Sequence, residues 1–208
     1  IVAGFGAAMK KSIDFDDTMR KVKATSGGTG DEFNQLRIKA LQMGRDTKFT
    51  ASESAEAMNY MALAGWDTKD MLKGVGGVMD LAAASGEDLA SVSDIVTDNL
   101  TAFGMKAKDS THFADVLAQT SSKANTDVRG LGEAFKYAAP VAGALGYTVE
   151  DTSVAIGLMS NAGIKGEKAG TALRTMFTNL SKPTKAMKDE MDKLGISITD
   201  SNGEMLPM

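Results

Sequence analysis

Apolar residues along the chain recur at helical spacing, in runs that end at glycine. One such run places Ala55, Met58 and Ala62 on a single helical face, with polar residues between them. Glycine at the end of a run predicts a helix stop, because it adopts the left-handed backbone conformation that closes a helix without steric strain. The predicted stops are Gly44, Gly65, Gly86, Gly104, Gly146, Gly163 and Gly195.

After five of these glycines comes a large apolar residue, which we expect to fold back onto the last helical turn. The five pairs are Gly65-Trp66, Gly104-Met105, Gly146-Tyr147, Gly163-Ile164 and Gly195-Ile196. Helix starts carry matching signals, since Thr50 and Glu53 form a capping-box sequence in which each side chain satisfies a free backbone donor. Further N-caps are predicted at Asp67, Ser85, Asp109, Thr126, Thr148 and Ser181.

These signals predict an all-α fold, a compact bundle of nine or ten short helices. The expected helices cover residues 2–24, 31–43, 51–64, 68–85, 87–103, 109–122, 127–145, 149–162, 166–180 and 183–194. Pro140 lies inside the seventh helix and is expected to kink or split it. Beyond the last helix, Ile196–Thr199 alternates in polarity and Asn202-Gly203 is a strong turn signal, so we expect a small C-terminal β-hairpin.

We expect three parts: an N-terminal helix and glycine-rich linker over 1–30, a helical core over 31–182, and a terminal helix with the hairpin over 183–208. Within the core, Glu56–Tyr60 resembles Glu133–Tyr137, and the residues around Gly65 resemble those around Gly146. Two interpretations stay open. The core contains two related helical units of about 50 residues, or the echo reflects residues that capped helices share.

Some glycines fall inside predicted helices, where each destabilises the helix by about 0.5–1 kcal/mol relative to alanine. Gly74, Gly76 and Gly77 lie in one such helix. A close crossing of two helices is the expected compensation, because it uses the space that a side chain would fill. The spacing of Gly166 and Gly170 favours the same interpretation.

Composition narrows the class of protein. A net charge of −4 argues against a dedicated nucleic-acid binder, and the lack of cysteine excludes disulfides and thiolate metal sites. No window approaches the roughly 18 uninterrupted apolar residues of a membrane-spanning helix. The chain starts at Ile1 within an apolar stretch that lacks a basic leader, so we expect a piece of a longer protein and no signal peptide.

We find no set of residues able to catalyse a reaction. His112 is the only histidine, and we expect it to be a half-exposed helical residue. Glu53-Ser54 and Gly157–Ser160 faintly resemble the motifs of peptidoglycan-cleaving transglycosylases, but Glu53 and Gly157 lie 104 residues apart and the glutamine of the second motif is missing. We therefore expect no enzyme, no cofactor and no metal.

Four residues are candidates for contact with a partner. Trp66 and Tyr147 are either exposed anchors or, since they follow terminal glycines, residues that pack on their own helices. Phe5 and Met9 lie on the first predicted helix, where apolar residues alternate with charge. That pattern favours pairing of this helix with another.

Seven segments, taken in their order and spacing, carry a family resemblance. They are Phe15–Ala24, Thr47–Ala55, Ala62–Trp66, Leu81–Ala84, Asn99–Gly104, Ala162–Arg174 and Leu180–Pro183. From about Phe15 to Leu206 the chain resembles the helical core of the tape measure proteins of long-tailed phages and prophages. Glu167-Lys168 departs from the Ser-Gln pair expected of that family, although both versions are polar.

This resemblance implies a structural virion protein that acts in tail assembly, tail-length determination and the later ejection step. It also implies partners, namely the tail tube protein, tail assembly chaperones and baseplate or tail-tip proteins. The implied location is the virion tail, and the host cytoplasm during assembly. No catalytic residue is carried over, and neither a small-molecule substrate nor direct nucleic-acid binding is expected. The alternative is a helical protein-binding or adaptor module of a bacterial protein.

Overall fold

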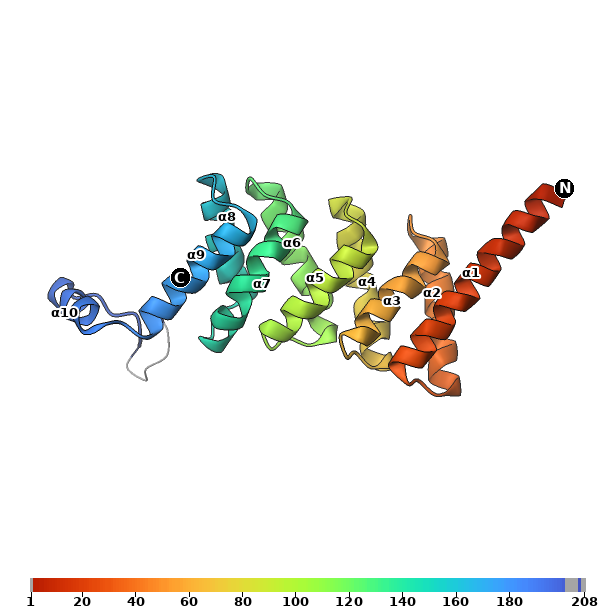
Figure 1. Ribbon diagram of the computed structural model, residues 1–208, viewed down its shortest axis with the longest axis horizontal. Helices are drawn as coiled ribbons and strands as arrows, with labels where there is room; N and C mark the ends of the chain where they lie inside the picture. Colours follow the sequence, from red (N-terminus) through yellow and green to blue (C-terminus); the bar gives the residue numbers. More distant parts are fainter. Residues whose placement is uncertain (1, 201–205, 207–208) are drawn as a thin grey trace. The chain divides into compact units, whose positions relative to one another are not determined.

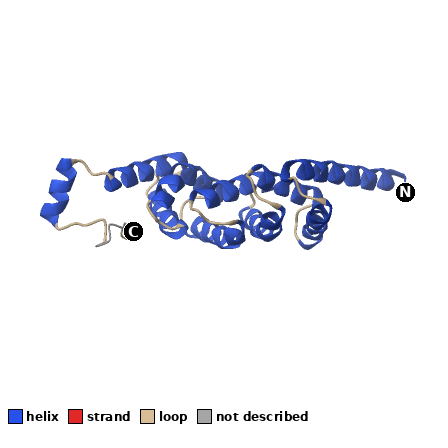
Figure 2. Cartoon of the chain, turned by 90° about the horizontal axis from the view of Figure 1, so that it is seen from below, coloured by secondary structure: helices blue, strands red, loops and turns tan. Residues whose placement is uncertain are grey.

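The fold is all-α, as the sequence predicts. The computed structural model describes residues 2–200 and 206, with the backbone alone for residues 2–8, and this part contains ten α-helices and one 3₁₀ helix (Figure 1). In chain order they are α1 (Val2–Ser26), α2 (Gly30–Asp46), α3 (Ala51–Leu63), α4 (Thr68–Ser85), α5 (Leu89–Ala102), η1 (Ala107–Asp109), α6 (Ser110–Lys123), α7 (Val128–Ala144), α8 (Val149–Asn161), α9 (Gly166–Ser181) and α10 (Lys185–Leu194). Loops join the helices, and the described residues form no strand (Figure 2).

The chain divides into two compact units, of which the first comprises residues 1–100 and 106–115. In this unit α1 and α2 both pack on α3, and α2 and α3 pack on α4 (Figure 1, red to yellow). Arg37 of α2 also reaches α1, where it pairs with Asp16 at 2.6 Å and lies over the ring of Phe15. The interior of the first unit is therefore built between amphipathic helices that are close in sequence.

The second unit comprises residues 101–105 and 116–208. Here α7 packs along α9, and α8 packs on both. The ring of Phe103 meets that of Phe135 edge to face, with the ring centroids 5.6 Å apart. Aromatic pairs in this geometry stabilise a fold beyond the area they bury.

Helices end at glycine in the way the sequence predicts. Gly65 follows α3 with a φ of +90°, and its N–H donates to the carbonyl of Ala62. The N–H of Trp66 then donates to the carbonyl of Met61 at 3.0 Å, which completes a Schellman motif. The same two bonds close three further helices, at Gly146, Gly163 and Gly195.

The N-cap predictions are confirmed in part. Three predicted caps accept a hydrogen bond from the third residue of their helix: Thr50, Asp67 and Thr148. Three others are wrong, because a carboxylate or hydroxyl one to three residues further on takes the role: Asp88 replaces Ser85, Asp127 replaces Thr126 and Thr184 replaces Ser181. Asp109 ends η1 instead of capping α6, and its carboxylate accepts the backbone N–H of Lys106.

Two predicted interruptions do not interrupt their helices. α2 continues through Gly44. This glycine lets the start of α3 come close to α2, since an added Cβ would stand 2.5 Å from the backbone nitrogen of Ala51. Pro140 lies within α7, which stays one helix. Pro140 and Lys136 are both exposed residues of α7, so the position at which the helix lacks one backbone donor lies on its solvent-facing side.

Close crossings at internal glycines are confirmed at three positions. A Cβ added to Gly77 in α4 would stand 2.7 Å from the Cα of Thr111, and one added to Gly170 in α9 would stand 2.2 Å from the carbonyl oxygen of Ala134. Gly74 in α4 is equally confined, by the ring of Trp66. In each unit, helices thus approach closely because a side chain is missing.

Gly76 and Gly166 do not fit that prediction. Nothing lies within 4 Å of a Cβ added to Gly76, so this residue lines no crossing. Gly166 is the first residue of α9, where it has a φ of +55°. Helical spacing alone does not distinguish a glycine at a crossing from one on a free face.

The expected C-terminal hairpin is not supported. After α10, Thr199 is a single bridge residue, and the N–H of Leu206 donates to the carbonyl of Ile198. The hydroxyl of Ser197 bonds to the backbone of Thr199, so the alternating polarity here accompanies a local turn. The turn signal at residues 202–203 lies outside the described residues.

Two neighbouring glycines of α4 give a matched stability test. We expect Gly77→Ala to lower the free energy of unfolding by about 1–3 kcal/mol, because the methyl group must displace the backbone of α6. Gly76→Ala should raise it by about 0.5–1 kcal/mol, because alanine favours the helix and meets no neighbour. Urea unfolding of both variants checks the two signs, and equal effects would contradict the crossing.

A second prediction concerns Tyr137 of α7. A hydrogen bond to Glu167 of α9 and the negative charge of that carboxylate raise the pKa of Tyr137 above 10.0, and desolvation and Glu133 add to the shift. The stabilisation that accompanies this raised pKa is present below pH 10 and is lost as the pH rises through the folded-state pKa. We expect Glu167→Gln to lower the pKa of Tyr137 in an ultraviolet titration, with Tyr137→Phe identifying the signal. An unchanged titration would exclude this contact.

Candidate functional site

The carboxylate that most resembles a catalytic acid is a helix cap. Glu53 Oε2 accepts the backbone N–H of Thr50 at 2.7 Å and its hydroxyl at 2.8 Å. Gly157, which begins the second transglycosylase-like motif, is buried in α8, where an added Cβ would stand 3.3 Å from the Cβ of Ala124. Both motifs therefore have structural roles in the packing and capping of helices.

His112 is an exposed residue of α6, consistent with the partly exposed helical position that we expected. Among the described residues, no three potential ligands of the histidine, aspartate or glutamate type gather closely enough to hold a metal ion. A search of the same residues finds no helix with the length and apolarity needed to cross a membrane.

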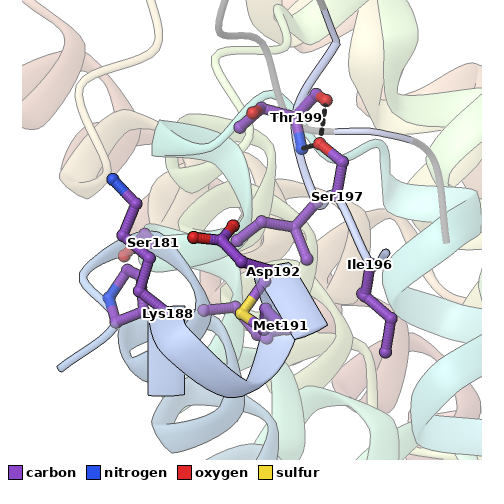
Figure 3. Close-up of a pocket in the computed structure, with 10 residues that line it drawn as sticks. Ser181, Lys188, Met191, Asp192, Ile196, Ser197 and Thr199 are labelled. Atoms are coloured by element: carbon purple, nitrogen blue, oxygen red, sulfur yellow. Dashed lines mark hydrogen bonds between the residues drawn. The ribbon is translucent and has the colours of Figure 1, made fainter. Parts of the chain in front are cut away.

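A cavity of about 240 Å³ lies between the end of α9 and α10 (Figure 3). Its lining includes one carboxylate, from Asp192, and one amine, from Lys188. Met191 and Ile196 contribute apolar surface. General acid–base hydrolysis of the glycosidase type uses two carboxylates, and the described residues that line this cavity supply one.

Trp66 is an interior residue of the first unit. Its side chain is only 8% exposed, and its ring occupies the space beside Gly74. Its backbone N–H is bonded to the carbonyl of Met61. The structure thus supports packing of Trp66 on its own helices, which was one of the two interpretations of the sequence.

Tyr147 has the corresponding position in the second unit. It is 7% exposed, and its ring stacks on that of Phe177 with the centroids 4.7 Å apart. Burial raises the pKa of Tyr147, and the nearby carboxylate of Asp151 raises it further. Tyr147 is therefore an interior residue of the second unit and stays neutral at physiological pH.

Of the two candidates on α1, only Met9 has a described side chain. Met9 is 56% exposed, and Ile13 one turn later is 52% exposed. The side chain of Phe5 lies outside the described residues. Met9 and Ile13 therefore form an exposed apolar pair, consistent with the expected surface for another helix.

The sequence did not indicate a second exposed pair, Val154 and Leu158 on α8, which are 61% and 65% exposed. The opposite face of α8 is buried and contains Ser153, Gly157 and Ser160. The buried face also includes Val149 and Ile156, so apolar residues lie on both faces of α8 and hydrophobicity alone does not distinguish them. α7 and α9 both pack on α8, and Gly157 lies against Ala124 and Thr120.

Two polar contacts were also missed by the sequence analysis. Lys48 Nζ donates to the carbonyls of Ala82 and Ala83 near the end of α4, where a positive charge complements the helix dipole. In the second unit, Asn125 accepts from Lys165 Nζ at 2.7 Å, while its backbone N–H donates to Asn161. In both cases the two partners are distant in sequence, so no local sequence pattern predicts the contact.

Comparison with known proteins connects this helical chain with phage tails. A family model described as phage-related minor tail protein matches residues 37–208. The chain is 41% identical over 206 residues to the tape measure protein of Pneumococcus phage Dp-1, an alignment that covers 99% of this chain and 18% of the relative. No solved structure gives a significant match.

Two further relatives are described as probable tape measure proteins. That of Escherichia phage P2 is 30% identical over 85% of this chain and 22% of its own length. That of Clostridium phage phiCD119 is 28% identical over 88% of this chain and 20% of its own length. The chain thus spans about a fifth of the curated relatives that it matches. It belongs to the phage-related minor tail protein family, and it corresponds to a region of a phage tail tape measure protein.

Proposed function

We propose that this chain is a folded helical module of a tape measure protein, which acts in tail assembly and determines tail length. The observation that carries the proposal is the 41% identity to the Dp-1 tape measure protein over 99% of the chain. The family match over residues 37–208 supports a structural role in the tail and no enzymatic one. It also favours a tail protein over the bacterial adaptor that the helical pattern left open.

In this proposal the folded module does not itself set the tail length. A single helix of 208 residues would extend about 310 Å at 1.5 Å per residue. The longest described helix, α1, has 25 residues and spans only about 37 Å. Glycines with positive φ end the helices, so we assign the measuring length to other parts of a parent chain.

We propose that the module acts in the virion tail, after assembly in the host cytoplasm with the tail tube protein, tail assembly chaperones and baseplate or tail-tip proteins. Phe5 and Met9 on α1 stay the candidate contacts, and the exposure of Met9 supports this. In the later ejection step the module would have to unfold to pass through a narrow tube. We also propose two related helical units within residues 31–182, which the matching helix ends at Gly65 and Gly146 support.

A phage that encodes this chain allows a direct test with the two neighbouring glycine variants. Gly77→Ala, which should destabilise the module, is expected to reduce the yield of tailed particles by roughly tenfold, as less folded protein is available for assembly. Tails that still form should have wild-type length in electron micrographs. Gly76→Ala is the matched control and should leave both yield and length unchanged.

The outcomes separate the parts of the proposal. Shortened or lengthened tails in the Gly77→Ala phage would contradict the assignment of the measuring length to other regions. A normal yield, despite confirmed destabilisation of the isolated chain, would contradict a role for the folded module in assembly.

A further inference from the structure

Methionine is distributed unequally between the interiors of the two units. The first unit buries six methionines, each at most 9% exposed, which we call the methionine core: Met19, Met43, Met58, Met61, Met71 and Met79. Among its described residues, the second unit buries no methionine. Its largest fully buried side chains are Phe135, Phe177 and Leu117.

A methionine core differs physically from one of leucine or phenylalanine. The methionine side chain is unbranched and has three rotatable bonds, so it fills irregular gaps and tolerates repacking. Its burial also removes more rotamer freedom than the burial of leucine. A core with several methionines is therefore specified less tightly and is easier to open than one built from stiffer side chains.

Both units bury aromatic rings, and the first unit buries Trp66 and Phe113 beside its methionines. In the second unit, aromatic rings also contact one another. The rings of Phe103 and Phe135 meet at 84°, and those of Tyr147 and Phe177 stack with an angle of 22° between their planes. Aromatic rings have few rotatable bonds and prefer defined mutual orientations. Because the described residues of the second unit combine such rings with no buried methionine, its core has fewer flexible side chains than the methionine core.

A separate feature weakens the first unit at the same place. α4 carries Gly74, Gly76 and Gly77 within a single turn, and glycine is a poor helix former. Gly74 and Gly77 lie at close contacts, so α4 depends on those contacts to stay helical. Met71 and Met79, on either side of this turn, belong to the methionine core. Loss of packing and loss of helix in α4 are thus coupled.

We propose that the first unit is a conformational device, whose methionine core and glycine-rich α4 let it open and repack while the second unit stays folded. The opening begins with the release of α4 from α2, α3 and η1, which are its packing partners. The inference rests on the two interiors alone, and it stands whether or not the chain acts in a phage tail.

Hydrogen exchange measured by mass spectrometry on the 208-residue chain tests this. After correction for intrinsic rates, amides of α3 and α4 should exchange at least tenfold faster than those of α7 and α9, because exchange under native conditions reports local opening. Equal rates, or slower exchange in α3 and α4, would overturn the proposal. This comparison requires no substitution.

A double variant tests whether the methionine core causes the faster exchange in α4. Met71→Leu with Met79→Leu conserves side-chain volume and stiffens the methionine core, so exchange in α4 should slow by at least threefold. Met176→Leu is the control. Met176 is partly exposed and lies in the second unit, so this substitution should leave the exchange rates of the α4 amides unchanged. Unchanged or faster exchange in the double variant contradicts the proposal. Failure of that variant to fold also contradicts it, since an adaptable core accepts such a substitution.

Discussion

Four helices of this chain end through one interaction, in which a glycine with positive φ turns the backbone and the next amide bonds back to the last helical turn. At Gly65 and Gly146 this closure also directs a large ring, of Trp66 or Tyr147, into the interior of its own unit. The closure thus sets helix length, reverses the chain and supplies a core residue.

The missing side chain of glycine has a second use inside the helices. At Gly77 and Gly170 the backbone of another helix occupies the space that a Cβ would need. Packing at these two glycines depends on shape, while charged groups act at helix ends, as at Thr50 and Glu53, and between helices, as at Arg37 and Asp16. Since the polar groups considered as candidates serve capping and packing, the chain suits a structural role, in agreement with its family.

Local chemistry explains why most helices could be predicted from the sequence, and tertiary contacts explain the errors. A glycine at the end of an apolar helical run predicts a stop, but Gly44 fits that pattern and instead gives α3 room to approach. Ser85 fails as a cap because Asp88 competes for the same helix. On α8 apolar residues lie on both faces, and packing on α7 and α9 buries Ile156 while Val154 and Leu158 stay exposed. The partner-contact candidates show the same limit. Trp66 and Tyr147 each follow a terminal glycine, a local sequence that fits a buried ring as well as an exposed anchor, and the tertiary structure buries both rings.

The free energy of unfolding of Gly146→Ala measures the central interaction most directly. An added Cβ at Gly146 meets nothing within 4 Å, so the left-handed backbone, with its φ of +82°, is the only strain that alanine introduces. If the glycine closes α7, alanine should lower the stability by about 1–2 kcal/mol while the helix content stays the same. A rise in stability with added helix, as alanine would give if α7 and α8 could join, would contradict the account.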